Sequence, residues 1–485
     1  MLRAVNPPFA FYLGDIMNKK LFSLISLLLV FCVLFLSFPL TAFAATDFVV
    51  EDGVLISYQG KSSSVTIPSG VYAVGDSAFE NNKTITSVNL KGVSVIGDKA
   101  FANCVALKSV TNTSDISSCG AYAFFNTPFQ NSYADKTLIL GSVLVYSSEN
   151  GDVIIDDKVV SIAPYAFAGN SNITSVFVGD KVASIGEGAF YKCTNLKEVS
   201  VSKYVTYIGA FAFEGTPYLS AVKDNFLILG NGILVDVNST ATNITVPDTV
   251  RQIGAGAFYK NTTVKSVTLP SSVTAINMRA FSGCASLTDV VLPENLVLID
   301  NEAFSNCTSL KSIVVPASVT LMGESIFIGC TNLQTAYIMT SADISRGMFA
   351  SCSALRNVRL TDGVNSIGDY AFYNCKTLIE VSVPDSVDNI SSLAFNGTDK
   401  VTVWCHKNSY AETFCASNKI KSGHIGDANL DNSVNIKDAT LIQKVSAKLV
   451  TMSFVDSMRG DYDFNGEINV RDATGIQKYI AGISE

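Results

Sequence analysis

Apolar residues recur along residues 45–422 in short runs separated by polar turns, with a period of 22 or 23 residues. The stretch AFSGCASLTDVVLPENLVLIDNEAFSNC, at 280–307, begins and ends on the same Ala-Phe-x-x-Cys signature and contains an L-x-x-V-x-L pattern. One such unit cannot bury its own apolar face. The pattern therefore predicts coils that stack into a leucine-rich solenoid, with one continuous core of Leu, Val, Ile and Phe.

The Phe of the signature marks each coil. Successive intervals are 22 or 23 residues except for two of 43 and 45 residues. The positions are Phe79, Phe101, Phe124, Phe167, Phe190, Phe213, Phe258, Phe281, Phe304, Phe327, Phe349, Phe372 and Phe395.

Three segments interrupt the period: FVVEDGVLIS at 48–57, LILGSVLVYS at 138–147 and LILGNGILVD at 227–236. Each has two β-prone runs around Gly or Asp-Gly, which predicts a hairpin. Two of these segments fill the long intervals. The chain is therefore expected to form three blocks, in which a hairpin precedes three, three and seven repeats.

Within a unit such as 268–287, a first strand ends at Leu-Pro, a second short run VTAI follows, and the Ala-Phe turn closes the coil. Proline is tolerated where a strand ends. The predicted fold class for 45–400 is a leucine-rich-repeat solenoid of short parallel strands in a curved sheet, with hairpin insertions. Neighbouring coils should lie about 4.8 Å apart, the spacing of paired strands.

Seven cysteines share one register, three residues after the repeat Phe. A metal site would need converging ligands, but the chain has only two histidines, so these thiols are interpreted as small buried apolar residues. Cys405 and Cys415 could form a disulfide or stay free, and Cys119 is off register. The seven are Cys104, Cys193, Cys284, Cys307, Cys330, Cys352 and Cys375.

After Ser422-Gly423 the period stops and another duplicated unit begins, DANLDNSVNIKDATLIQKV at 427–445 and DYDFNGEINVRDATGIQKY at 461–479. Each copy offers oxygen ligands at positions 1, 3, 5, 9 and 12 and a carbonyl at position 7, which is the EF-hand arrangement for Ca²⁺. Two calcium ions are predicted, against the alternative of acidic turns without metal. The predicted ligands are Asp427, Asn429, Asp431, Ser433, Asn435 and Asp438, then Asp461, Asp463, Asn465, Glu467, Asn469 and Asp472.

Each loop runs into an apolar-periodic helix, predicted at 439–449 and 473–480. Asn432 stands where such loops usually have Gly at position 6, and Asn tolerates positive φ.

The first 44 residues read as a secretory signal peptide. Met17 to Lys20 is a basic start, 21–36 is apolar, and Ala42-Phe43-Ala44 fits a cleavage site, so the true start is expected at Met17. The apolar run is also long enough for a membrane anchor, but the small-residue ending favours cleavage. We therefore expect a secreted, extracellular protein without a membrane span after cleavage. With 34 basic and 42 acidic residues, the chain shows no electrostatic footprint for nucleic acid.

The blocks SVTAINMRAFSGCASL, VLIDNEAFSNCTSL and VNSIGDYAFYNCKTL resemble the BspA-like leucine-rich repeats of bacterial surface proteins, over roughly 50–420. Residues 401–422 look like that family's closing strand and helix, with Ser409 as N-cap. A ligand of the solenoid, either a protein or a cell-wall glycan, would meet outward residues of the strand face such as Phe177, Tyr337 and Arg359. The alternative is an ordinary solvated sheet face.

The last sixty residues, 426–485, closely resemble a type I dockerin, a small all-α tandem EF-hand-like module that binds cohesin domains of scaffoldins. The resemblance implies cohesin contacts from loop positions 10 and 11 and from the following helix, in two nearly equivalent copies. They correspond to Ile436, Lys437, Gln443, Lys444 and Lys448, then Val470, Arg471, Gln477 and Lys478.

These resemblances imply a non-catalytic component of a cellulosome-like polysaccharide-degrading complex, held at the cell surface through a scaffoldin. Dockerins usually accompany glycoside hydrolases, so an enzyme or enzyme regulator is the alternative. Glycoside hydrolysis needs two carboxylates about 5–10 Å apart, and no such pair recurs at fixed spacing. A passive surface spacer or adhesin is the third interpretation.

Overall fold

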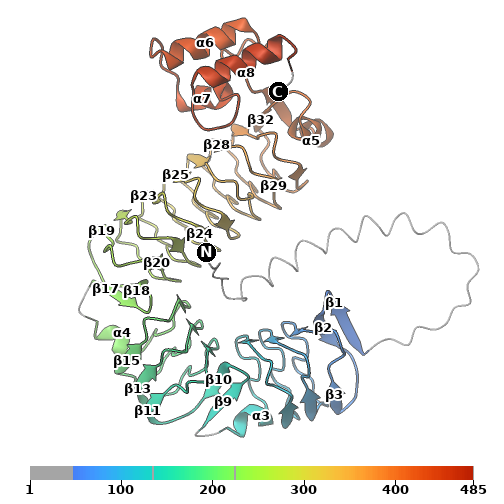
Figure 1. Cartoon of the computed structure of the whole chain (residues 1–485), viewed down its shortest axis with the longest axis vertical. Helices are drawn as coiled ribbons and strands as arrows, with labels where there is room; N and C mark the ends of the chain where they lie inside the picture. Colours follow the sequence, from blue (N-terminus) through green and yellow to red (C-terminus); the bar gives the residue numbers. More distant parts are fainter. Residues whose placement is uncertain (1–46, 134–135, 223–224, 484–485) are drawn as a thin grey trace, which may run out of the picture. The chain divides into compact units, whose positions relative to one another are not determined.

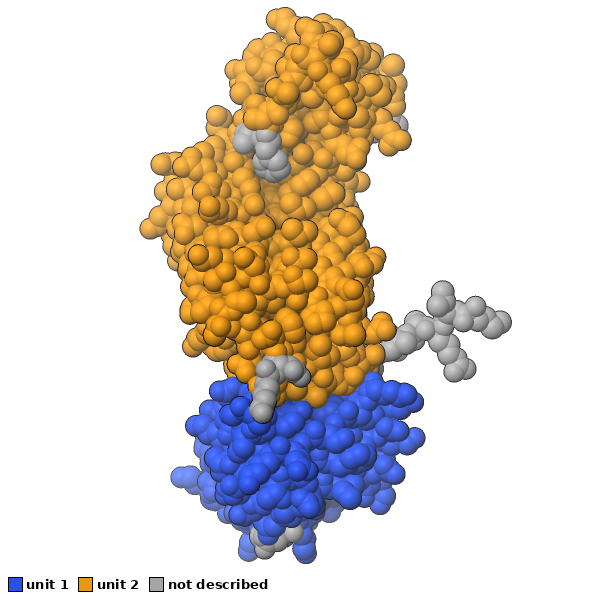
Figure 2. All heavy atoms as spheres, turned by 90° about the vertical axis from the view of Figure 1, so that its left-hand side faces the viewer, with its two compact units in different colours: residues 1–205, 212–221 blue, residues 206–211, 222–485 orange. Residues whose placement is uncertain are grey.

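The structure is a computed structural model that describes residues 47–133, 136–222 and 225–483 (Figure 1). The predicted signal peptide at 1–44, with its start at Met17, lies outside these residues. The chain divides into two compact units: residues up to 205 together with 212–221, and residues 206–211 together with 222 onward (Figure 2). Over the described ranges, no helix has both the length and the apolar character needed to cross a membrane.

Most coils contribute one longer and one shorter strand, as the repeat pattern predicts. In the coil that follows Val264, strand β21 (Ser266–Thr268) buries its central Val267 and directs its flanking polar residues outward. The two-residue strand β22 (Ala275–Ile276) follows, and the turn at Phe281 closes the coil. Alternation along a strand thus separates core from solvent.

In the first unit, strands of successive coils pair in parallel, and antiparallel hairpins begin two of the sheets, β1-β2 and β9-β10. Equivalent residues of successive repeats lie opposite one another in these pairs of strands. Val88 of β5, for example, lies opposite Val65 of β3 and Val110 of β7. The elements are β1 (Phe48–Glu51), β2 (Val54–Tyr58), β3 (Ser64–Thr66), β4 (Ala73–Val74), β5 (Ser87–Asn89), β6 (Val95–Ile96), β7 (Ser109–Thr111), β8 (Ser118–Cys119), α3 (Pro128–Asn131), β9 (Thr137–Leu140), β10 (Val143–Ser147), β11 (Gly151–Ile154), β12 (Ser161–Ile162), β13 (Ile173–Val178), β14 (Ser184–Ile185), β15 (Glu198–Val201) and α4 (Pro217–Ser220).

The second unit begins its sheet with the hairpin β17-β18 and ends with three helices. One of its two six-stranded sheets has the order β25-β27-β28-β30-β32-β33. The elements are β16 (Tyr207–Ile208), β17 (Phe226–Leu229), β18 (Ile233–Val237), β19 (Asn243–Thr245), β20 (Gln252–Ile253), β21, β22, β23 (Asp289–Val291), β24 (Leu298–Ile299), β25 (Ser312–Val315), β26 (Leu321–Met322), β27 (Thr335–Ile338), β28 (Asn357–Leu360), β29 (Ser366–Ile367), β30 (Glu380–Ser382), β31 (Asn389–Ile390), β32 (Thr402–Cys405), α5 (Tyr410–Asn418), β33 (Lys421–His424), α6 (Ile436–Ser446), α7 (Phe454–Gly460) and α8 (Val470–Ile480).

The repeat Phe side chains form stacked ladders inside the coils. Around Phe304, ring centroids lie 5.0 Å from Phe281 and 5.5 Å from Phe327, and all three rings are fully buried. Backbone hydrogen bonds join the same neighbouring coils. The Phe281 N–H donates to the Ala303 carbonyl of the next coil at 2.8 Å. These three Phe residues therefore fill the core, and each bonds through its backbone N–H to the next coil.

Each ladder is closed by aromatic residues from other elements. The ring of Tyr58 in the first hairpin is tilted against that of Phe79, with centroids 5.0 Å apart, and Phe129 of the short helix α3 packs against Phe124 at 5.3 Å. The predicted cap at 401–422 forms β32 and α5, whose Phe414 lies 6.3 Å from Phe395. The end coils are thus shielded from water, as a solenoid requires. The sequence did not predict β33, which extends the last sheet.

The thiols of the repeat cysteines have a specific role in addition to filling space. Cys307 Sγ donates to the carbonyl of Phe281, the repeat Phe of the preceding coil, at 3.1 Å. The other six do the same at 3.0–3.1 Å. Cys405 and Cys415, whose pairing the sequence left open, are both free and buried.

These buried thiols are expected to resist thiol reagents. Burial raises the pKa of Cys193, Cys284 and Cys375 to about 12, so the reactive thiolate is scarce at neutral pH. Treatment of the native protein with Ellman's reagent should leave all ten described cysteines unmodified, while the same treatment in guanidinium chloride should modify every one. Peptide mass spectrometry checks this. Rapid native labelling at Cys284 or Cys307 would contradict the packing described above.

Candidate metal sites and their contact with the repeats

Residues 426–483 form a C-terminal module in which α6 and α8 share a small core. Ala439 and Ile442 of α6 pack with Ala473 and Ile476 of α8, and all four are buried. Helix α7 lies between the two copies and was not predicted from sequence. Both α6 and α8 begin three residues earlier than predicted, at Ile436 and Val470.

The earlier helix starts follow from capping boxes built by the loops themselves. Asn435 caps α6 with its side chain, while Asp438 accepts a hydrogen bond from the Asn435 N–H at 2.9 Å. Asn469 and Asp472 repeat the arrangement in α8, at 2.8 Å. Loop positions 9 and 12 therefore fix the first helical turn, and this places the buried position-12 carboxylate at the centre of each loop.

Three carboxylates converge in each loop. In loop 1 (427–438) these are Asp427, Asp431 and Asp438, and one oxygen of each lies within 4.8 Å of the others. Loop 2 (461–472) brings together Asp461, Asp463 and Asp472 in the same way. Like charges held this close destabilise one another unless a cation lies between them.

The buried members of these clusters have raised pKa values. Burial raises the pKa of Asp472 to about 7, and neighbouring carboxylates add to the effect. Burial likewise raises the pKa of Asp427, as does the charge of Asp438. The pKa of Asp461 is also raised by burial, although the guanidinium of Arg359 opposes the shift.

The position-1 carboxylates provide the test of fit for a hard cation. Asp427 Oδ2 accepts the Asn432 N–H and Asp461 Oδ2 accepts the Gly466 N–H, both at 3.0 Å. Their Oδ1 atoms are buried without a hydrogen-bond partner. A buried carboxylate oxygen without a partner is costly unless a metal binds it. The donor set is all oxygen, which fits Ca²⁺.

Position 6 has the left-handed backbone that these loops require. Gly466 has φ 94°, and Asn432 reaches φ 65° in its place in loop 1. Position 4 is left-handed too, with Leu430 at φ 62° and Phe464 at φ 53°. The two loops therefore share one backbone course despite their different residues at position 6.

The remaining predicted ligands make turn and cap bonds inside the loops. Asn429 accepts from the Asp431 N–H and Asn465 accepts from the Glu467 N–H, both at 2.8 Å. Asn435 donates to the Ser433 carbonyl at 2.9 Å. The Asn469 side chain accepts from the N–H of the residue two positions on. These bonds hold the loops curved around the carboxylates.

All nine residues predicted to contact a cohesin are exposed on the module. Ile436 is 57% and Val470 60% exposed at equivalent positions of the two copies. Lys437 approaches Asp431 of its own loop at 3.8 Å. The others are Gln443, Lys444, Lys448, Arg471, Gln477 and Lys478.

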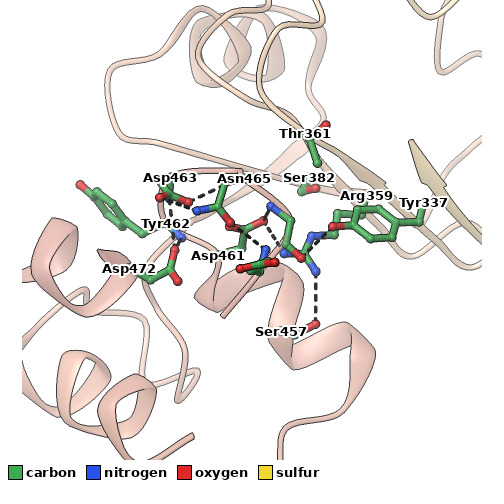
Figure 3. Close-up of polar contacts among 12 residues, drawn as sticks. Tyr337, Arg359, Thr361, Ser382, Ser457, Asp461, Tyr462, Asp463, Asn465 and Asp472 are labelled. Carbon is green, nitrogen blue, oxygen red and sulfur yellow. Dashed lines mark hydrogen bonds and ion pairs between the residues drawn. The ribbon is translucent and has the colours of Figure 1, made fainter. Parts of the chain in front are cut away.

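The three residues predicted to bind a ligand on the strand face fall into two groups. Phe177 is 51% exposed on β13, beside Ile154, which is 76% exposed. Tyr337 and Arg359 instead lie beneath the C-terminal module, and Arg359 is only 4% exposed. The expectation that they face solvent is wrong, because loop 2 covers them (Figure 3).

Loop 2 contacts the repeats through its backbone and its position-1 carboxylate. Arg359 forms an ion pair with Asp461 (Figure 3). The Tyr337 hydroxyl donates to the Gly466 carbonyl at 2.7 Å. The Asp362 N–H donates to the Phe464 carbonyl at 3.0 Å.

In a second ion pair, the module supplies the cation and the repeats supply the carboxylate. Arg459 of α7 pairs with Glu380 of β30, and both side chains are more than nine-tenths buried. The Arg459 guanidinium also lies over the Trp404 ring, 4.9 Å from its centroid. Trp404, Ile425 and Phe464 form an apolar cluster beside these charges.

Sequence reasoning missed Glu380, Trp404 and Arg459 as interface residues. One signal was present, since one outward position of successive coils aligns Val314, Tyr337, Arg359, Ser382 and Trp404. Toward the C-terminus this column changes from Val314 to Tyr337 and Arg359, and it ends on Trp404 after the small Ser382. The repeat period does not predict which segment of the chain covers the residues of this column.

Comparison with known proteins finds similar solved structures but no curated relative. Among solved structures, a leucine-rich cell surface protein of Faecalibacterium prausnitzii is 23% identical, covering 76% of this chain and 94% of its own, with a TM-score of 0.31. The pneumococcal vaccine antigen PcpA is 16% identical, covering 77% and 95%, with a TM-score of 0.34. A Bacteroides capillosus leucine-rich repeat protein is 31% identical over 24% of this chain and 96% of its own, with a TM-score of 0.21.

The family assignment rests on the repeats. The model of the BspA type leucine-rich repeat region matches residues 57–150, 145–226, 237–355 and 340–447, which is well over half of the chain. These ranges contain every stacked Phe of the ladders described above. The chain belongs to the BspA-type leucine-rich repeat family.

Proposed function

We propose that the chain is a secreted, non-catalytic component of a cellulosome-like polysaccharide-degrading complex. Its C-terminal module acts as a type I dockerin that binds two calcium ions and docks into a cohesin of a scaffoldin, which holds the protein at the cell surface. The repeats present a surface for a protein or cell-wall glycan. The observation that supports this most is the duplicated loop and helix, with three converging carboxylates and one unpartnered buried oxygen in each copy.

Calcium would supply the positive charge that the converging carboxylates lack. Asp427, Asp431 and Asp438 would hold one ion, and Asp461, Asp463 and Asp472 the other. The module has a small core, so metal binding is expected to contribute much of its folding free energy. Only the metal-loaded module would then present its helices in fixed positions.

Two equivalent docking faces support a dockerin role. Each offers an apolar residue followed by a basic one, Ile436-Lys437 and Val470-Arg471, and then Gln-Lys on the helix. All of these side chains are exposed while loop 2 contacts the repeats. A cohesin could therefore bind either face without displacing the module.

Calorimetric titration of the purified chain with a panel of cohesin modules, in calcium and then in EDTA, tests the proposal. Tight binding to one cohesin class in calcium alone supports it. If no cohesin binds in either condition, the assembly role fails, and the chain becomes a surface adhesin with a different C-terminal function.

Substitutions on the two faces test the dual mode. Replacing Lys437 and Lys444 with Ala should lower cohesin affinity by only about twofold. The substitution removes one of two equally populated binding modes and leaves the other intact. Replacing Arg471 and Lys478 with Ala should do the same. The quadruple variant should lose binding, as measured by the same calorimetry. If the Lys437 and Lys444 pair alone abolishes binding, the two faces are not equivalent.

On the repeats, Phe177 is the strongest remaining residue of the predicted strand-face site. It and Ile154 form an exposed apolar pair on neighbouring strands. Exposed aromatic side chains of this kind suit both protein and glycan ligands.

A further inference from the structure

The two metal loops have different surroundings in this chain. Loop 2 lies on the outward column of the repeats, where Tyr337 and Arg359 contact Gly466 and Asp461. Among the described residues, loop 1 makes its polar contacts within the module, apart from the Asp427 N–H, which donates to the His424 carbonyl at 3.2 Å. The loops are alike internally, but among the described residues only loop 2 contacts the outward column of the repeats.

Arg359 contacts loop 2 through one of the two carboxylate oxygens of Asp461. It pairs with Asp461 Oδ2, which also accepts the Gly466 N–H, and it leaves the Oδ1 atom of Asp461 buried without a partner. The equivalent Asp427 Oδ2 accepts the Asn432 N–H, and no ion pair to it is present among the described residues. The contact with the repeats thus orients Asp461 and leaves its second oxygen open.

The module is also joined to the repeats without a spacer. Strand β33 pairs in parallel with β32, and the N–H of Gly426, two residues after β33, donates to the Arg459 carbonyl at 2.8 Å. Two buried ion pairs cross the contact, Arg359 with Asp461 and Arg459 with Glu380. The repeats supply the cation in the first pair, and the module supplies it in the second. Such charges are costly when separated inside a low-dielectric contact, so partial undocking is unfavourable.

We propose that calcium in loop 2 locks the module onto the repeats, and that Tyr337 and Arg359 in turn strengthen calcium binding by loop 2 and not by loop 1. The inference rests on the proposed calcium binding and is independent of cohesin docking. Without the ion, Asp461, Asp463 and Asp472 repel one another and loop 2 loses its fixed course. The Phe464 and Gly466 carbonyls then lose their partners on the repeats. Because binding free energies are linked, the effect is reciprocal.

The fluorescence of Trp404, the single tryptophan of the chain, should show whether the module is docked on the repeats. Trp404 is 8% exposed beneath Arg459 and beside Phe464. Chelation of the wild-type protein should shift its fluorescence to longer wavelength and increase quenching by acrylamide. The matched variants Asp472→Ala and Asp438→Ala each remove a fully buried position-12 carboxylate. In calcium, Asp472→Ala should expose Trp404 while Asp438→Ala keeps it shielded.

Calcium titration tests the reverse direction. Tyr337→Phe removes one hydrogen bond to loop 2 without changing any charge, so it should weaken one of the two calcium sites by about fivefold. In the Asp438→Ala background, where loop 2 is the remaining site, the same weakening should appear. In the Asp472→Ala background Tyr337→Phe should have no effect. Tyr204→Phe, at a side chain that is 54% exposed, is the control.

The outcomes separate the inference from the proposed function. If calorimetry detects no calcium binding to the wild-type chain, the proposed calcium sites and the lock both fail. If two ions bind but Trp404 does not respond to chelation, or Tyr337→Phe weakens both sites equally, the lock alone is overturned. If a single variant fails to fold, the wild-type chelation experiment and Tyr337→Phe alone still decide.

Discussion

Replacing Asp438 and Asp472 together with Ala is expected to abolish calcium binding and, with it, the ordered C-terminal module. Both carboxylates are fully buried, and each accepts the N–H that begins its helix. The substitution therefore removes a predicted metal ligand and a capping partner from each copy. At calcium concentrations about a thousandfold above the dissociation constant, the ion stabilises a fold by about 4 kcal/mol, which is a large share of the stability of so small a core.

Circular dichroism and calorimetry measure this result. The double variant should lose helical signal and bind a cohesin at least about a hundredfold more weakly, which corresponds to about 3 kcal/mol. Asp289→Ala, at an exposed carboxylate of β23, is the matched control and should leave both signals unchanged. Retention of cohesin affinity by the double variant, or by the wild type in EDTA, would show that docking does not depend on the loops.

Replacing Phe304 with Ala is expected to produce the largest loss of stability in the repeats. Its ring is fully buried between Phe281 and Phe327, so the substitution opens a cavity within a continuous ladder. Truncations of this kind cost about 3–5 kcal/mol, because the surroundings collapse only in part. In a solenoid each coil is stabilised by its neighbours, so the loss should weaken coils on both sides.

Urea unfolding and hydrogen exchange measure the effect. Exchange should accelerate at the backbone amides of Phe281 and Phe304, which bond to the neighbouring coils. Phe125→Ala, at a ring that is 52% exposed, is the control and should change stability by less than about 0.5 kcal/mol. Equal destabilisation by the two substitutions would contradict the assignment of the ladder as the core.

The contact between loop 2 and the repeats changes the interpretation of the strand face. Tyr337 and Arg359, which the residue types favoured for a ligand, are occupied by the chain's own C-terminal module. Phe177 keeps its exposed position. A search for a repeat ligand should therefore begin at the Ile154 and Phe177 pair.

The sequence by itself determined the elements whose cause is local or periodic. The interval between Phe residues predicts the coils, because only stacking can bury a repeating apolar face. Gly and Asp-Gly between β-prone runs predict the three hairpins, which the structure contains. The spacing of carboxylates within a 12-residue loop predicts their convergence, since loop curvature acts over so few residues.

Tertiary structure alone decided which distant residues meet. The bond from Cys307 to the Phe281 carbonyl spans 26 residues and needs the offset between stacked coils. The pairing of Arg359 with Asp461 spans 102 residues. A periodic pattern specifies which side of a strand faces outward, but the partner there depends on how the chain folds back on itself. Local composition carries no information about that path. Arg359, predicted to face outward toward a ligand, is therefore found buried beneath loop 2.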